Sequence, residues 1–184
     1  MAIDEKTQEF FIDQIKTTKE IINKFSDTKE FSPTMLINSL LSLVVLPFES
    51  AKKANGEKVF PGTYKDLEKK LGFNPVVFQP IKKCDGNKTE YANKTIYAYI
   101  NKFRNGIAHQ NLTVSVNEER VIFITVYNKF KCSNCSKCKS KVCTEKGLQY
   151  TRSGIVDFRI TVTVKQLQKL ALYISDSYLR AIEG

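Results

Sequence analysis

The sequence of 184 residues contains a single histidine, His109. No GxGxxG or Walker pattern is present, which argues against a Rossmann or P-loop nucleotide site. The first five residues are acidic and polar rather than basic and then apolar, so they do not resemble a secretory signal. We therefore expect a cytoplasmic protein that performs its chemistry without a glycine-rich phosphate loop.

Long apolar runs are also scarce. The most apolar stretch, 35–48, is interrupted by Asn38, Ser39 and Ser42, and is too short to span a bilayer. We expect it to be a buried core helix and expect no membrane association. A hydrophobic fraction of 42% and a mean hydropathy of -0.29 are typical of a soluble globular protein of one domain.

Positive charge is in excess, with a formal net charge of +10 at pH 7. Such a surplus favours an anionic partner, and nucleic acid is the commonest one. A lysine-rich composition that serves solubility is the plainer alternative. Charge alone leaves both interpretations open.

Hydrophobic spacing predicts a mainly α fold in which the whole chain, 1–184, forms one domain. Helices are expected at about 4–25, from an N-cap at Ser32 to Leu46, at 63–71, at 91–109, and from a Thr163-x-x-Gln166 capping box to the C-terminus. Pro47 should end or kink the second helix, and 55–62 should be a loop. Alternating runs at 112–116, 121–127 and 155–162 predict an antiparallel β-hairpin or small sheet inserted over 112–162 into the helical bundle.

The fourth of these helices carries the most informative residues, Arg104 and His109. At about 100° per residue its apolar residues form one core stripe. Arg104 and His109 then bracket a polar strip that contains Asn101 and Asn105, and Gly106 could loosen the helix and bring His109 closer. A solvated helix end, where cations complement the helix dipole, is the structural alternative.

Histidine transfers protons near neutral pH, and arginine holds phosphate oxygens in a fixed fork. Metal-free RNA cleavage uses the 2′-hydroxyl as nucleophile, with one group accepting its proton and another protonating the departing 5′-oxygen. One histidine serves both roles poorly. A two-fold dimer would bring two copies of Arg104 and His109 to one cleft.

The segment Arg104-Asn-x-x-x-His109 resembles the signature of the HEPN superfamily (higher eukaryote and prokaryote nucleotide-binding). Phe31 to Leu43 and Val164 to Ile174 resemble the N-terminal and last helices of a short bacterial branch. This resemblance implies a dimeric, metal-independent endoribonuclease that leaves a 2′,3′-cyclic phosphate. By the same resemblance, Arg104 steadies the scissile phosphate and His109 transfers protons. Asn105 orients either the histidine or the phosphate.

The resemblance also implies a role as a toxin or in anti-phage defence, with an antitoxin or defence-system protein as partner. We expect Asn101 and Lys102 on the same helix to contact RNA. The alternative is a non-catalytic RNA- or nucleotide-binding module, or one that recruits a partner protein, because HEPN relatives without nuclease activity exist. A scaffold or antitoxin-like protein is a third hypothesis.

A cysteine-rich tip is predicted at 129–146, within the inserted region. Cys132, Cys135, Cys138 and Cys143 have the spacing of a structural four-cysteine zinc site, although an iron–sulfur cluster uses the same ligands. Accidental clustering of free thiols is the remaining alternative. With four protein ligands no position is left for water, so a catalytic zinc is not expected. The tip lysines Lys137, Lys139 and Lys141 are expected to meet RNA phosphates.

Two other chemistries are less favoured. A Cys–His hydrolase is set aside because four cysteines group at metal spacing, and the fifth, Cys84, reads as a small buried residue. Tyr91, Tyr97 and Tyr99 could stack on bases, but aromatic residues at helical spacing more often pack inside a bundle.

Overall fold

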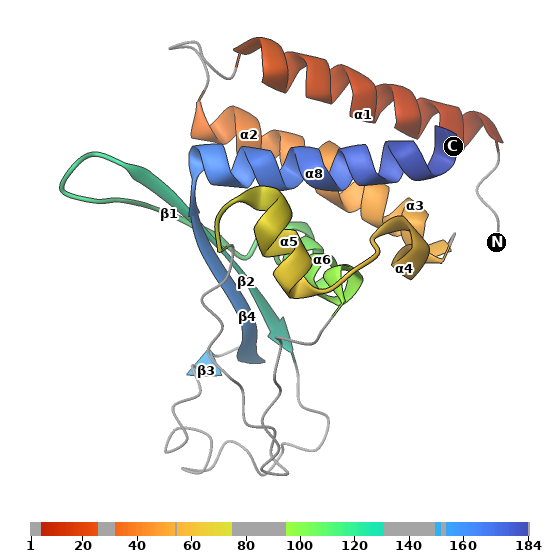
Figure 1. Ribbon diagram of the computed structural model, residues 1–184. Coiled ribbons are helices and arrows are strands. Elements are labelled where there is room, and N and C mark those ends of the chain that lie inside the picture. The colour runs from red at the N-terminus through yellow and green to blue at the C-terminus, as the bar shows by residue number, and fades with distance from the viewer. Residues whose placement is uncertain are drawn as a thin grey trace, which may run out of the picture.

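The computed structural model describes residues 5–25, 32–53, 55–74, 95–130, 150–151 and 154–183. The fold is mainly α with a small antiparallel sheet, as predicted (Figure 1). The elements are α1 (Glu5–Phe25), α2 (Pro33–Leu40), the π-helix η1 (Leu41–Val45), α3 (Leu46–Lys53), α4 (Gly56–Val59), α5 (Tyr64–Leu71), α6 (Ile96–Ala108), β1 (Leu112–Val116), β2 (Ile122–Phe130), β3 (Tyr150–Thr151), β4 (Gly154–Thr163) and α8 (Val164–Glu183).

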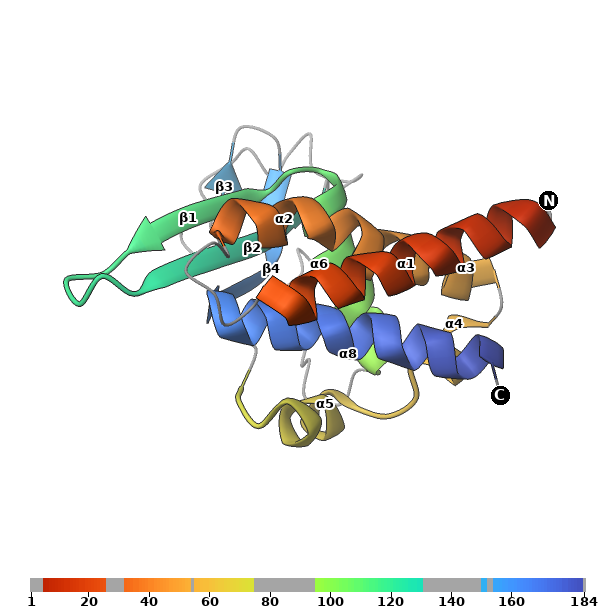
Figure 2. The same cartoon turned by 90° about the horizontal axis from the view of Figure 1, so that it is seen from above.

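The two longest helices, α1 and α8, run antiparallel and lie beside α2 (Figures 1 and 2). Two ion pairs connect α1 to α8: Lys16 Nζ lies 2.8 Å from Glu183 Oε1, and Lys19 pairs with Asp176. Apolar side chains fill the space between the helices, since Ile15, Ile22 and much of α8 are buried. The predicted capping box of α8 is confirmed by reciprocal hydrogen bonds between Thr163 and Gln166.

The second helix does not end at Pro47, so the first of the two predicted outcomes, an end or a kink, was wrong. Helices α2, η1 and α3 follow one another without a break from Pro33 to Lys53. Within η1 the Leu46 N–H donates to the Leu41 carbonyl, an i to i−5 bond, immediately before Pro47. Proline has no N–H and its ring collides with the preceding turn of an α-helix, so the wider π-turn accommodates it.

This continuous helix lies in the core, as expected. Among the described residues, the stretch Pro33–Lys52 is long and apolar enough to cross a bilayer by length and mean hydropathy (1.5) alone. Half of it is buried inside the molecule. Leu36, Leu40, Leu43, Val44 and Phe48 are almost entirely shielded from solvent. Burial against α1, α6 and α8 accounts for its apolar character.

The sheet has the strand order β1-β2-β4-β3, and all its pairs are antiparallel. Its β1–β2 hairpin projects beyond the helices in both views (Figures 1 and 2). Val114 and Val116 on this hairpin are therefore 53% and 61% exposed. The strand predictions were right in place and pairing; β3 and the one-turn helix α4, which lies in the predicted loop 55–62, were missed.

Two of the three tyrosines considered as base-stacking residues pack in the bundle. The Tyr97 ring stacks on Phe48 at 5.0 Å between centroids, and Tyr99 meets Phe158 edge-on at 5.2 Å. Tyr91 and Cys84 lie outside the described residues.

Candidate active site

Helix α6 carries the candidate residues and passes between α3 and η1 on one side and strand β2 on the other. Its N-cap is Thr95, whose hydroxyl accepts from the Ala98 N–H at 3.2 Å. The predicted core stripe is confirmed, because four side chains spaced along one side of the helix are buried: Ile96, Ile100, Phe103 and Ile107. Tyr99 and Gly106 widen the buried surface.

Gly106 lies at a close contact between α6 and the sheet. A Cβ atom on this residue would lie 2.6 Å from Val126 Cγ1 and 2.8 Å from the Tyr127 carbonyl oxygen. The helix continues to Ala108, so Gly106 does not loosen it as considered from the sequence. The glycine instead sets how closely β2 approaches the C-terminal end of α6.

The end of α6 is held by a Schellman motif. The Asn111 N–H donates to the Gly106 carbonyl at 2.8 Å, and the Gln110 N–H donates to the Ile107 carbonyl at 2.9 Å. Gln110 adopts a left-handed conformation with φ 54°. His109 is the C-cap residue immediately before it, and its side chain is exposed at the end of the helix.

The Arg104 side chain is bound to Glu49 and Asn105 rather than directed toward His109. Its Nη2 forms an ion pair with Glu49 Oε1 of α3, and its Nη1 donates to Asn105 Oδ1 at 2.6 Å. The Arg104 and Glu49 side chains are 21% and 38% exposed, so water screens the pair only partly. The buried Nε of Arg104 has no hydrogen-bond partner in the described part of the chain.

The two candidate catalytic side chains are therefore not joined within one protomer. They lie five positions apart in the sequence, which places them about 7.5 Å apart along the helix axis and about 140° around it. No hydrogen bond within the described part of the chain links Arg104 to His109. The sequence predicted a polar strip with Asn101 and Asn105, and both are indeed partly exposed, as is Lys102 on the same helix.

Glu49 was missed by sequence reasoning. It lies 55 positions before Arg104, and only the packing of α3 on α6 brings the two together. A carboxylate just after a long apolar run was the available signal. Because Glu49 is paired with Arg104, the positive charge of Arg104 is already partly neutralised before a substrate binds.

Comparison with known proteins identifies the family of this helical plan. The model of a family described as HEPN pEK499 p136 matches residues 1–183. The chain belongs to this HEPN family. No curated protein and no solved structure matches it.

Membership of a HEPN family indicates a nuclease or another RNA-related function in general terms. The match runs through the sheet and the cysteine-rich segment as well as through the helices. The predicted zinc ligands Cys132, Cys135, Cys138 and Cys143 lie outside the described residues, as do Lys137, Lys139 and Lys141. Their roles stay predictions from the sequence.

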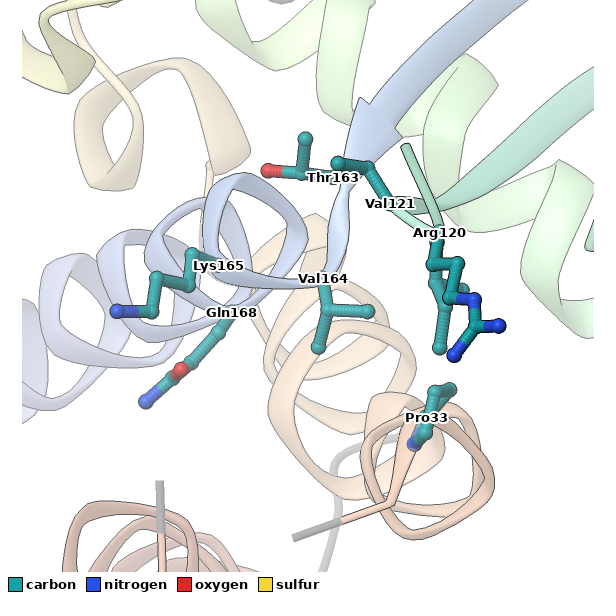
Figure 3. A pocket seen from close by; sticks show the side chains of 8 residues that line it. Pro33, Arg120, Val121, Thr163, Val164, Lys165 and Gln168 are labelled. Atoms are coloured by element: carbon teal, nitrogen blue, oxygen red, sulfur yellow. The ribbon is translucent and has the colours of Figure 1, made fainter. Parts of the chain in front are cut away.

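A pocket of about 450 Å³ lies elsewhere on this HEPN domain, where β2, β4 and α8 meet the start of α2. Its lining consists of Pro33, Arg120, Val121, Ile122, Thr163, Val164, Lys165 and Gln168. Figure 3 shows Val164 between Arg120 and Lys165, with the Lys165 amine directed away from Arg120. None of these residues belongs to the predicted site, so we do not assign the nuclease centre to this pocket.

Proposed function

We propose that this HEPN protein is a metal-independent endoribonuclease. The observation that carries the proposal is the family match over residues 1–183 together with the place of Arg104 in the last two turns of α6 and of His109 at its C-cap. His109 is the chain's only imidazole and is exposed there, within reach of a large substrate. Arg104 supplies a guanidinium whose N–H groups are only partly occupied by Glu49 and Asn105.

In the proposed reaction the ribose 2′-oxygen attacks the adjacent phosphorus, and the bond between phosphorus and the 5′-oxygen breaks. The 2′-hydroxyl proton leaves to a base, the 5′-oxygen gains a proton from an acid, and the products are a 2′,3′-cyclic phosphate and a 5′-hydroxyl. A neutral His109 can accept the first proton, and a protonated copy can donate the second. Arg104 would hold a non-bridging phosphate oxygen.

Because one protomer has one histidine, we propose that the active site is completed by a homodimer. A two-fold axis beside the C-terminal end of α6 would place two copies of His109 and Arg104 along one RNA-binding cleft. Asn105, Asn101 and Lys102 are partly exposed on the same helix and would line it. Light scattering on the purified chain should give twice the mass of 21.0 kDa.

The test compares wild type with His109→Ala on total RNA in EDTA, with analysis of the new RNA ends. Wild type should cut and leave cyclic phosphates, and His109→Ala should not cut. Gln110→Ala, which changes the next exposed residue, is the matched control and should cut like wild type. Cleavage by His109→Ala at the wild-type rate would refute the proposal.

The Arg104–Glu49 ion pair favours a second candidate, a non-catalytic RNA-binding module or one that recruits a partner protein. If the guanidinium serves only to join α6 to α3, wild type should bind RNA without cutting it. The same assay separates the candidates, because intact RNA ends after prolonged incubation with wild type would favour the module.

We further propose that the cysteine-rich tip binds one structural zinc ion through Cys132, Cys135, Cys138 and Cys143. The proposal is based on their spacing. Elemental analysis should find one zinc ion per chain, and Cys135→Ser should lower this value. In the cleavage assay the zinc content is measured after EDTA treatment, so that loss of the tip metal is not mistaken for loss of a catalytic one.

The biological role that we propose is that of a cytoplasmic toxin or anti-phage effector controlled by a partner protein. Expression of wild type should then arrest growth, whereas His109→Ala should not. Equal toxicity of both proteins would contradict this role.

A further inference from the structure

One face of the sheet is turned away from the helices, and five of its residues define what we call the outer face: Phe123, Thr125, Tyr127, Arg159 and Thr161. Alternate residues of β2 and β4, such as Ile124 and Ile160, are buried against the core. Side chains of a strand alternate between its two faces, so the residues between them point the other way. A hydrogen bond of 2.9 Å between the Thr125 and Thr161 hydroxyls confirms that these two share a face.

The helices that contact the sheet, α6 and α8, do so from the core side. Gly106 of α6 lies against Val126, which belongs to the buried set. Both helices are seen on one side of β2 and β4 in Figure 1. The outer face is therefore the side of the sheet that the described helices do not cover.

The outer face combines aromatic, cationic and hydroxyl side chains. Phe123 and Tyr127 are both partly exposed aromatic residues on β2, about 13 Å apart along the strand. Arg159 on β4 lies directly opposite Tyr127 in the register. The remaining members, Thr125 and Thr161, are neutral hydroxyl residues, so these five side chains include no carboxylate.

Arg159 adds an independent observation. Its Nε is buried and has no hydrogen-bond partner in the described part of the chain. A buried donor without an acceptor carries a desolvation cost, which a ligand that brings an acceptor would remove. A phosphate oxygen is the acceptor that an arginine fork matches best.

The outer face also adjoins the candidate active site. The Tyr127 N–H donates to the Asn111 carbonyl at 3.1 Å. Asn111 lies two residues after His109, and the Schellman motif fixes this short connection. The end of α6 that carries His109 is thus adjacent, through one backbone hydrogen bond, to the strand position of Tyr127.

We propose that the outer face binds single-stranded RNA and guides it to His109, with bases stacked on Phe123 and Tyr127 and a phosphate held by Arg159. Aromatic rings on an open sheet stack on any base, whereas a duplex hides its base faces within its own helix. The part of the proposal that concerns His109 rests on the proposed nuclease function, but binding by the outer face does not.

The test measures binding of a fluorescently labelled single-stranded 12-nucleotide RNA by anisotropy, in the His109→Ala background so that the probe stays intact. Tyr127→Leu and Phe123→Leu should each weaken binding about 5- to 150-fold, which corresponds to the effect of removing one base-stacking ring. Tyr127→Phe keeps the ring and should bind like the parent. A loss in Tyr127→Phe equal to that in Tyr127→Leu would overturn the stacking assignment.

Arg159→Gln should weaken binding and make the logarithm of affinity less steep in the logarithm of salt concentration by about 0.7, the contribution of one phosphate contact. Lys65→Gln, which removes an exposed cation on α5, is the control and should change the affinity less than twofold. The same sequence annealed to its complement should bind more weakly than the single strand. Equal binding of parent, Phe123→Leu and Tyr127→Leu, the result expected if this face instead receives a protein partner, would refute the proposal.

Folding is checked for every variant by circular dichroism and thermal unfolding, and Tyr127→Leu is judged only against Tyr127→Phe at equal folded fraction. The two proposals fail separately. If wild type never cuts RNA but the ring variants lose binding, the nuclease assignment fails and the outer face stands. If wild type cuts and the ring variants bind and cut normally, the outer face assignment fails alone.

Discussion

Gly106 of α6 lies so close to Val126 of β2 that a methyl group on the glycine would come within 2.6 Å of Val126 Cγ1. The obstacle includes the Tyr127 main chain as well as a side chain, so it cannot be relieved by a change of rotamer alone. The helix that carries the candidate catalytic residues is thus positioned by a glycine contact with the sheet.

Gly106→Ala should destabilise the protein by about 1–3 kcal/mol, the usual cost of overpacking. At an exposed helix position the same change stabilises the protein by about 1 kcal/mol. The sign of the change in unfolding free energy therefore tells whether Gly106 is in close contact with the sheet. Chemical denaturation measures the effect. Ala108→Gly, at an exposed position of the same helix, is the control and should cost about 0.5–1 kcal/mol. A more stable Gly106→Ala protein would contradict the close contact.

The Arg104–Glu49 ion pair should be measurable as a coupling energy. Both side chains are partly shielded, so we expect about 1–2 kcal/mol, between the values for surface and buried pairs. The measurement is a double-mutant cycle with Glu49→Gln, Arg104→Gln and the double variant, each unfolded in denaturant. If the two single changes add without coupling, the pair does not hold α3 to α6.

Much of the fold follows from local pattern. The stripe of Ile96, Ile100 and Phe103 predicted the buried side of α6, and the Thr163–Gln166 capping box predicted where α8 begins. Strand alternation placed β2 and β4, each of which has one buried face, and it also placed β1, although no residue of β1 is buried. These features depend on residues that lie within a few positions of one another.

The rest depends on tertiary contacts that local spacing does not record. Pro47 is a helix breaker by the usual rule, but a π-turn in η1 accommodates it inside a buried helix. Glu49 meets Arg104 only because α3 packs on α6. From the sequence, Gly106 suggested a loosened helix. In the folded protein it is a position where α6 packs closely on β2.

Gln110→Gly should stabilise the end of α6. Gln110 has φ 54°, a left-handed conformation that costs a residue with a Cβ about 1–2 kcal/mol. Glycine removes this cost but gains freedom in the unfolded chain, so a net gain of about 0.5–1 kcal/mol over Gln110→Ala is expected. Thermal unfolding of the two variants checks it. A Gln110→Gly protein less stable than Gln110→Ala would show that the C-cap geometry is not the one described.

Alkaline pH should unfold the protein through two buried phenols. Burial raises the pKa of Tyr64 to about 12 and the pKa of Tyr99 well above its usual value. In the unfolded chain both titrate near 10, so above this pH the unfolded state loses protons first. The stability that these phenols contribute is therefore complete below about pH 10 and declines as the pH rises toward 12, by about 1.4 kcal/mol per pH unit for each phenol.

The Tyr64→Phe/Tyr99→Phe double variant tests this, because it removes both titrations while keeping the rings, whose centroids lie 5.8 Å apart. Denaturant unfolding at several pH values between 9 and 12 gives the slope of stability against pH. The double variant should have a shallower slope than wild type over this range, whatever its stability at pH 8. The single variant Tyr64→Phe should recover part of the difference, and its effect should level off near pH 12, where the folded Tyr64 itself ionises. Parallel slopes for wild type and the double variant would mean that other groups govern alkaline unfolding, and that Tyr64 and Tyr99 ionise equally readily in the folded and unfolded chains.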